Sequence, residues 1–322
     1  MVASMAVGGP GDMGDGPHIP ATAPRGAVAG FGIRGPARMG RAAGRRHARP
    51  MEATMTDTAV QVLGPMAATV GGTRVRLGGP RPRAVLAALV AAGGATVPEQ
   101  HLIDAVWDDR LPARPRHALH TCVADLRRAL EPHRPAGHAP SVLRHGPGGY
   151  RLSLAPDAVD ARRFAALVER AGAAARARRP HDALASADRA LSLWRGPAFA
   201  DLAHLPFLDP ERWRLTELRC AAREIRADAL LTLDAHHLAV AECALLTTEA
   251  PLRESAWALR ARTLYRSGRQ AEAAAVLHTA RRTLRDELGV HPGPELAHLT
   301  QRVLVHDPAL AAEPAAPARR PA

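Results

Sequence analysis

The chain has 322 residues, of which 47% are hydrophobic and only 3% aromatic. This length suits two domains with tails, and the shortage of aromatic residues favours helices over sheets, because alanine is the best helix former. The net charge is +12, and all 43 basic residues are arginine. Without lysine the chain has neither a P-loop nor a Schiff-base nucleophile, which excludes nucleotide hydrolysis by that loop and pyridoxal catalysis.

The basic charge concentrates in one part of the chain, since residues 59–157 hold 12 arginines against 7 acidic residues. This excess favours a polyanionic partner. Three separated cysteines, Cys122, Cys220 and Cys243, form no CxxC pair and are typical of buried thiols in a reducing cytoplasm. The longest apolar run, residues 84–92, is too short to span a bilayer, and no signal peptide is recognisable. We therefore expect a soluble cytoplasmic protein.

No catalytic, cofactor or metal site is expected. The sixteen histidines include no HExxH motif and no Cys/His spacing of a zinc site, and the neighbouring His236 and His237 would point to different faces of a helix. The chain also lacks a GxSxG nucleophile elbow and a clear pair of catalytic carboxylates. An enzymatic function is therefore disfavoured.

Both ends of the chain are expected to lack a fold. Residues 1–58 are rich in Gly, Ala, Pro and Arg without an apolar period, so they bury too little surface to offset the entropy of ordering. Either they form a disordered basic tail, or translation begins at Met51 or Met55. Residues 309–322 are expected to form a second disordered tail.

Between the tails, the chain begins with a small antiparallel sheet, predicted from short strands at residues 60–64, 67–70 and 73–77. Two helices follow. The first is predicted to open at Pro82 and to end at Gly93, and the second has Pro98 in its first turn.

The helix predicted at residues 114–131 has an apolar face and a basic face. The apolar stripe comprises Leu119, Val123, Leu126 and Leu130, with Cys122 at its edge. The opposite face carries groups suited to base edges and phosphates: Arg114, His117, Thr121, Ala124 and Arg128, flanked by Arg116, His120 and Arg127, with Asp125 on the other side. Alone, this pattern is typical of a solvated amphipathic helix. A hairpin predicted at residues 141–152 completes the order of a winged helix-turn-helix, in which this helix reads DNA.

Residues after 158 are predicted to be helical throughout. Related patterns at residues 236–239 and 268–273 are about 34 residues apart, the period of tetratricopeptide repeats, which stack helix pairs. The most distinctive segments are residues 193–198, 251–257, 265–273 and 286–296. We therefore expect a mainly α protein, with an N-terminal winged helix carrying small antiparallel sheets and a C-terminal all-α repeat domain.

These segments are similar to known domains. Residues 59–155 resemble the OmpR-type winged helix, and residues 158–308 resemble the bacterial transcriptional activation domain. Together, over residues 60–310, they resemble the Streptomyces antibiotic regulatory protein family. The resemblance implies a pathway-specific activator of secondary-metabolite genes that binds promoter direct repeats in double-stranded DNA as a homodimer and recruits RNA polymerase holoenzyme. It also implies the short form of the family, without the nucleotide-binding domain of larger members and without a receiver domain.

The resemblance directs attention to individual side chains. DNA contacts are expected from Arg114, Arg116, His117, His120, Thr121, Arg127 and Arg128 on the helix, from Arg144, His145 and Arg151 in the hairpin, and from Arg83 near the first helix. Among these, we expect base contacts from His117, His120, Thr121 and Arg128 and phosphate contacts from Arg114, Arg116 and Arg127. Arg83 is equally consistent with a plain surface charge. Asp125 either accepts from a cytosine amine or pairs with Arg128, and the pairing is favoured. Tyr150 is expected to anchor the hairpin on the core.

The loop of Asp108, Asp109, Arg110 and Leu111 corresponds, by the same resemblance, to the loop that contacts RNA polymerase in OmpR-type activators. An ordinary solvated turn is the alternative. For the whole chain two rival functions remain: a protein-interaction scaffold that binds nucleic acid incidentally, and a repressor that uses the same DNA-binding domain.

Overall fold

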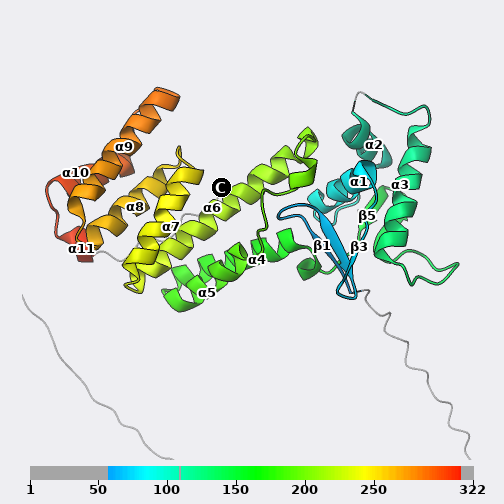
Figure 1. Ribbon diagram of the computed structural model, residues 1–322, viewed down its shortest axis with the longest axis horizontal. Helices are drawn as coiled ribbons and strands as arrows, with labels where there is room; N and C mark the ends of the chain where they lie inside the picture. Colours follow the sequence, from blue (N-terminus) through cyan, green and yellow to red (C-terminus); the bar gives the residue numbers. More distant parts are fainter. Residues whose placement is uncertain (1–56, 109, 313–322) are drawn as a thin grey trace, which may run out of the picture. The chain divides into compact units, whose positions relative to one another are not determined.

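The computed structural model describes residues 57–108 and 110–312, all of which belong to one compact unit. The chain begins with a three-stranded antiparallel sheet in the order β1-β2-β3, formed by Thr58–Gln61, Ala67–Val70 and Thr73–Val75. Three helices follow, namely α1 (Pro80–Ala91), α2 (Glu99–Trp107) and α3 (Pro115–Leu130). An antiparallel hairpin of β4 (Leu143–Gly146) and β5 (Gly149–Leu152) comes next. This is the winged helix-turn-helix predicted from the sequence (Figure 1).

The rest of the described chain is helical (Figure 1). Three short 3-10 turns, η1 (Pro156–Ala158), η2 (Ala200–Leu202) and η3 (Pro206–Leu208), separate longer helices. The longer helices are α4 (Asp160–Arg176), α5 (Pro180–Leu191), α6 (Asp209–Thr232), α7 (His236–Glu249), α8 (Glu254–Arg266), α9 (Gln270–Leu288) and α10 (Pro294–Leu304). Helices joined by short turns pack as antiparallel neighbours. The mainly α fold class expected from the sequence is confirmed.

The apolar stripe of α3 packs into the core of the winged helix. Leu119, Val123, Leu126 and Leu130 are each at most 1% exposed, and Cys122 is buried at the edge, as the helical projection predicted. A helix with one buried face presents its other face to solvent. The core therefore fixes which side chains of α3 are available to a partner.

The turn between β1 and β2 is held by the helical part of the chain. The backbone N–H groups of Val62 and Leu63 donate to the two carboxylate oxygens of Asp160, at 2.8 and 3.1 Å. In return, the N–H of Arg195 donates to Leu63 O (2.7 Å) and the N–H of Phe199 to Val62 O (2.8 Å). The predicted strand at residues 60–64 is therefore wrong in position: β1 ends at Gln61 because the next backbone groups bond to α4 and the loop before η2 instead of to β2.

Gly64 allows this close approach. Its φ of +146° lies in a region that side chains rarely adopt, and a Cβ there would lie 3.0 Å from Cβ of Arg195. Phe164 of α4 and Phe199 are completely buried in the same core cluster as Leu63 and Leu86 of the winged helix. One continuous core thus runs from the winged helix into the first helices of the repeat region.

The described ends correct two expectations about the tails. Thr58 belongs to β1, and its buried hydroxyl donates to Leu130 O at 3.1 Å, so order begins before residue 59. At the other end, α11 (Ala309–Ala312) contradicts a tail that is disordered from residue 309, because Leu310 is buried against the cluster of Trp257 and Tyr265. The alternative start sites Met51 and Met55, and the tail beyond residue 312, lie outside the described residues.

Candidate nucleic-acid interface

The exposed face of α3 is basic. Pro115 occupies the first turn of the helix, where its missing N–H costs nothing, and the helix runs on to Leu130. Arg114, Arg116 and His117 are exposed at its start, and within residues 57–108 and 110–312 no acidic side chain pairs with either arginine. These guanidinium groups are available for phosphate or base contacts.

Further along α3, two expected contact residues interact within the helix. Nη2 of Arg128 donates to Oδ1 of Asp125 at 2.8 Å, which is the pairing favoured by the sequence analysis, and the Arg128 side chain is 79% exposed. The hydroxyl of Thr121 donates to His117 O at 3.0 Å, which leaves its oxygen to accept. Because an exposed i,i+3 pair is weak, Arg128 can exchange Asp125 for a base edge.

Arg127 of α3 contacts the β4-β5 hairpin of its own chain. It is half-buried, its Nε donates to Leu143 O in β4 (3.0 Å), and its guanidinium lies 5.8 Å from the centre of the Tyr150 ring. Arg127 thus fastens the wing, the β4-β5 hairpin, to α3. The phosphate contact expected of Arg127 stays a prediction, and the helical projection on which it relied carries no information about where the hairpin lies.

The wing presents two more arginines. Arg144 pairs with Arg151 across the hairpin, so both side chains lie on one face, and both residues are exposed. Together with Thr96 and the hairpin turn they line a hollow of about 220 Å³. Two guanidinium groups on one face of the wing have the charge and hydrogen-bond donors that suit phosphate oxygens.

Tyr150 anchors the wing, as expected. Its ring is buried and packs on the ring of His145 with the centroids 4.6 Å apart, and burial raises the pKa of its hydroxyl. Its backbone pairs with that of Val97 in both directions, at 2.8 and 2.9 Å. Gly149 makes this possible, since its φ is +118° and a Cβ there would lie 2.1 Å from Val97 O.

Glu99 was missed by the sequence analysis. Its Oε1 lies 3.1 Å from Nε2 of His145 in the wing and 3.4 Å from Nε2 of His120 on α3. Both histidines were expected to contact DNA independently. Local periodicity predicts neither the Glu99–His145 nor the Glu99–His120 contact, because the two residues of each pair are 46 and 21 positions apart in the chain.

Arg83 lies on α1 and pairs with the helical region. Its Nη1 is 2.6 Å from Oδ2 of Asp201 in η2, and Oδ1 of the same carboxylate accepts the N–H of Met66 at 2.8 Å. The neighbouring Arg81 donates to Val106 O and lies over the Trp107 ring. The structure therefore gives Arg83 a partner in the helical region, and its phosphate contact stays a prediction beside the alternative of a plain surface charge.

The loop between α2 and α3 is exposed in its described part. Asp108 ends α2 with a positive φ of 45°, Arg110 is exposed, and the apolar side chain of Leu111 is 55% exposed. Asp109 lies outside the described residues. An exposed leucine in a loop of charged residues is suited to a protein contact.

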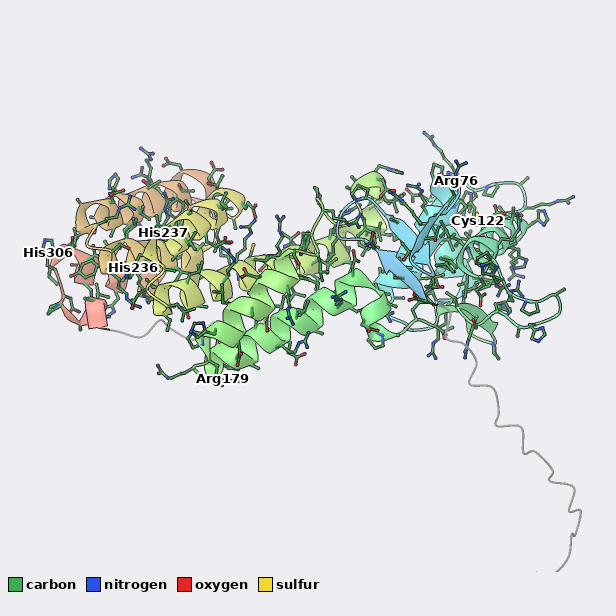
Figure 2. All side chains as sticks on the ribbon, turned by 60° about the horizontal axis from the view of Figure 1, so that its bottom comes forward. Arg76, Cys122, Arg179, His236, His237 and His306 are labelled. Carbon is green, nitrogen blue, oxygen red and sulfur yellow. The ribbon has the colours of Figure 1, made fainter. Side chains whose placement is uncertain are left out.

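Other reactive groups are few. In the described part of the chain no group of three or more His, Cys, Asp or Glu side chains is arranged to hold a metal ion. The neighbouring His236 and His237 lie at the start of α7 (Figure 2).

All three cysteines are free and buried. Burial raises the pKa of each thiol, that of Cys243 to about 12, which keeps the thiols protonated and unreactive. None of the described helices is both long and apolar enough to cross a membrane.

Comparison with known proteins agrees with this arrangement. Residues 72–152 match the family model described as "Transcriptional regulatory protein, C terminal", and residues 159–304 match that of the "Bacterial transcriptional activator domain". The regulatory protein DnrI of Streptomyces peucetius is 34% identical over 254 residues, which cover 78% of this chain and 93% of that protein. The chain belongs to the Streptomyces antibiotic regulatory protein family.

Two other family relatives are longer than the region they share with this chain. The regulatory protein AfsR of Streptomyces coelicolor is 41% identical over 254 residues, which are 78% of this chain but only 24% of AfsR. Among solved structures, Mycobacterium tuberculosis EmbR in complex with a low-affinity phosphopeptide matches with a TM-score of 0.74 and 34% identity, covering 80% of this chain and 69% of that one. The fold described above is therefore that of the shared region.

Proposed function

We propose that this chain is a sequence-specific DNA-binding transcriptional activator, which acts on a secondary-metabolite pathway in the cytoplasm, at the nucleoid. The observation that carries the proposal is the basic surface formed by the start of α3 and the wing. It presents Arg114, Arg116, Arg144 and Arg151 without acidic partners in the described part of the chain. The names of the relatives, which are all regulatory proteins, support the same function.

In this proposal α3 enters the major groove and the wing follows the backbone. Arg128 and Thr121 read base edges, with His117 beside them, whereas Arg114, Arg116 and the wing arginines bind phosphates. Two copies occupy neighbouring direct repeats. Because both copies read the same face of the duplex, the repeats are spaced by about 10 to 11 base pairs, one helical turn.

The loop between α2 and α3 is proposed to contact RNA polymerase holoenzyme. The exposed Leu111 supports this role, and it is flanked by the charged residues Asp108, Asp109 and Arg110. A variant such as Leu111→Ser should keep its affinity for DNA and lose transcription. Loss of both activities would place the loop in the DNA contact or in the fold instead.

Footprinting of the full chain across the promoters that flank its gene tests the proposal, at about 150 mM salt to suppress nonspecific phosphate binding. Discrete protection over direct repeats supports sequence reading. Featureless coverage that disappears with added salt would favour the scaffold with incidental nucleic-acid binding. Transcription in vitro then separates the activator from the repressor, because only an activator raises the rate from the protected promoter.

A further inference from the structure

Glu99 connects the two parts of the proposed DNA-binding surface. The carboxylate is 23% exposed, and its Oε1 lies within 3.4 Å of Nε2 of both His120 and His145. His120 belongs to α3 and His145 to the wing, so one oxygen of α2 is shared by the helix and the hairpin. No other described carboxylate lies within ion-pairing distance of these two imidazoles.

The position of Glu99 is fixed relative to the wing. Two residues earlier, Val97 exchanges both backbone hydrogen bonds with Tyr150 of β5. The Tyr150 ring in turn packs against both histidines, with centroids 4.6 Å from His145 and 6.5 Å from His120. The carboxylate and the two imidazoles are therefore held around one buried aromatic ring.

This geometry selects one tautomer of each histidine. An ionised carboxylate only accepts hydrogen bonds, so both Nε2 atoms must carry the hydrogen. In the neutral imidazole Nδ1 is then left as a hydrogen-bond acceptor. Solvent or a partner can reach it, because the side chains of His120 and His145 are 54% and 50% exposed. An acceptor there suits the amine of cytosine or adenine, and added protonation turns it into a donor for phosphate.

A negative charge beside DNA is otherwise unfavourable. A carboxylate repels phosphates, whereas Arg116 on α3 and Arg144 and Arg151 in the wing are exposed cations on the elements that carry the two histidines. The two imidazoles cover the carboxylate and leave it 23% exposed. A positioning role explains a partly buried acid at this place better than a direct contact with DNA does.

We propose that Glu99 is a positioning residue for DNA recognition, which holds His120 of the helix and His145 of the wing in one tautomer so that they meet the operator together. This inference rests on the DNA-binding function proposed above. Glu99→Ala removes the acceptor, whereas Glu99→Gln retains a carbonyl oxygen at the same place without the charge. Asp104→Ala is the matched control, because it removes a carboxylate five residues further along α2 whose side-chain partner is Gln100 and not a histidine.

The first measurement uses the full chain without DNA. Nitrogen NMR of the imidazoles should show the Nε2–H tautomer for His120 and His145 in the wild type, in Glu99→Gln and in Asp104→Ala. A mixture of tautomers is expected in Glu99→Ala. If the tautomers in Glu99→Ala equal those of the wild type while the rest of the spectrum is native, the inference is wrong, whatever the protein binds.

The second measurement compares binding to the footprinted operator with binding to random DNA. Glu99→Ala should lower this specificity ratio about tenfold, and Glu99→Gln should restore most of it. Since both variants remove the charge, equal effects would assign Glu99 an electrostatic role and overturn the proposal.

A double-mutant cycle combines Glu99→Ala with His145→Ala. The double variant should lose less of the specificity ratio than the product of the two single losses, and multiplicative losses would also overturn the proposal. If the wild type itself shows no specificity, the proposed function fails, while the tautomer measurement still decides the role of Glu99.

Discussion

Nη1 of Arg83 lies 2.6 Å from Oδ2 of Asp201, an ion pair that joins α1 of the winged helix to η2 of the helical region. The same carboxylate accepts the N–H of Met66 in the turn after β1. An arginine near a helix N-terminus is a common phosphate ligand, and the sequence allowed that role for Arg83. The structure directs it to a carboxylate of its own chain.

We therefore expect Arg83→Ala to leave the salt dependence of DNA binding unchanged and to destabilise the fold by less than about 1 kcal/mol, because the pair is partly exposed. Arg116→Ala is the matched comparison. It should weaken binding to all sequences and reduce the slope of log K against log salt by about 1. Titrations at several salt concentrations measure both slopes. A reduced slope for Arg83→Ala would return this residue to the DNA interface.

Removal of the Asp160 carboxylate should be far more damaging. Burial raises the pKa of this carboxyl, an effect opposed by the hydrogen bonds from Val62 and Leu63 and by the charge of Arg195. Asp160→Ala leaves two buried N–H groups without acceptors, at a cost of about 2 to 5 kcal/mol. Urea unfolding measures the loss. Asp182→Ala, which removes an exposed partner of Arg179, should change stability by less than about 0.5 kcal/mol; similar losses for both would contradict the role of Asp160.

The shared core predicts that the winged helix does not fold alone. A fragment of residues 57–155 would expose Leu63 and Leu86 where Phe164, Phe199 and other buried side chains of the helical region now pack. We expect this fragment to aggregate or to give the circular dichroism of an unfolded chain. A fragment of residues 57–233, which retains α4 to α6, should fold cooperatively. A well-dispersed NMR spectrum from the shorter fragment would show that the two parts are independent domains.

Residues whose role depends on one helix were predictable, whereas residues whose role depends on distant segments were not. The buried stripe of α3 follows from the period of 3.6 residues, and the Asp125–Arg128 pair follows from a spacing of three. The contacts of Arg127 with Leu143 O and of Glu99 with His145 depend on where the wing docks, and the backbone pairing of Val97 with Tyr150 holds it there. No local pattern encodes that pairing.

The expected base contact of Arg128 can be separated from phosphate binding. Arg128→Ala should reduce discrimination against a single changed base pair in the operator by about 1 to 3 kcal/mol, with a small effect on random DNA. Arg114→Ala should weaken binding to operator and random DNA alike, because a phosphate contact carries no sequence information. Binding to a set of single-substitution operators distinguishes the two. Uniform weakening by Arg128→Ala would move its contact to the backbone.

The last prediction concerns Asp228 on α6. Burial raises its pKa to about 7, although the charges of Arg262 and Arg266 on α8 act in the opposite direction. Because the ordinary value is near 3.8, the folded chain binds a proton at this site between about pH 4 and pH 7 that the unfolded chain does not bind. The contribution of Asp228 to stability therefore falls as pH rises through this window, and above pH 7 the cost of a buried charge is complete.

Asp228→Asn should thus stabilise the protein at pH 8, by on the order of 2 kcal/mol, and have little effect at pH 5. Urea unfolding of both chains at the two pH values measures the difference. Glu287→Gln removes an exposed carboxylate of α9 and serves as the control, for which no such dependence on pH is expected. If Asp228→Asn destabilises the protein equally at both pH values, then Asp228 is charged in the fold and stabilised by Arg262 and Arg266, and burial is not the dominant effect.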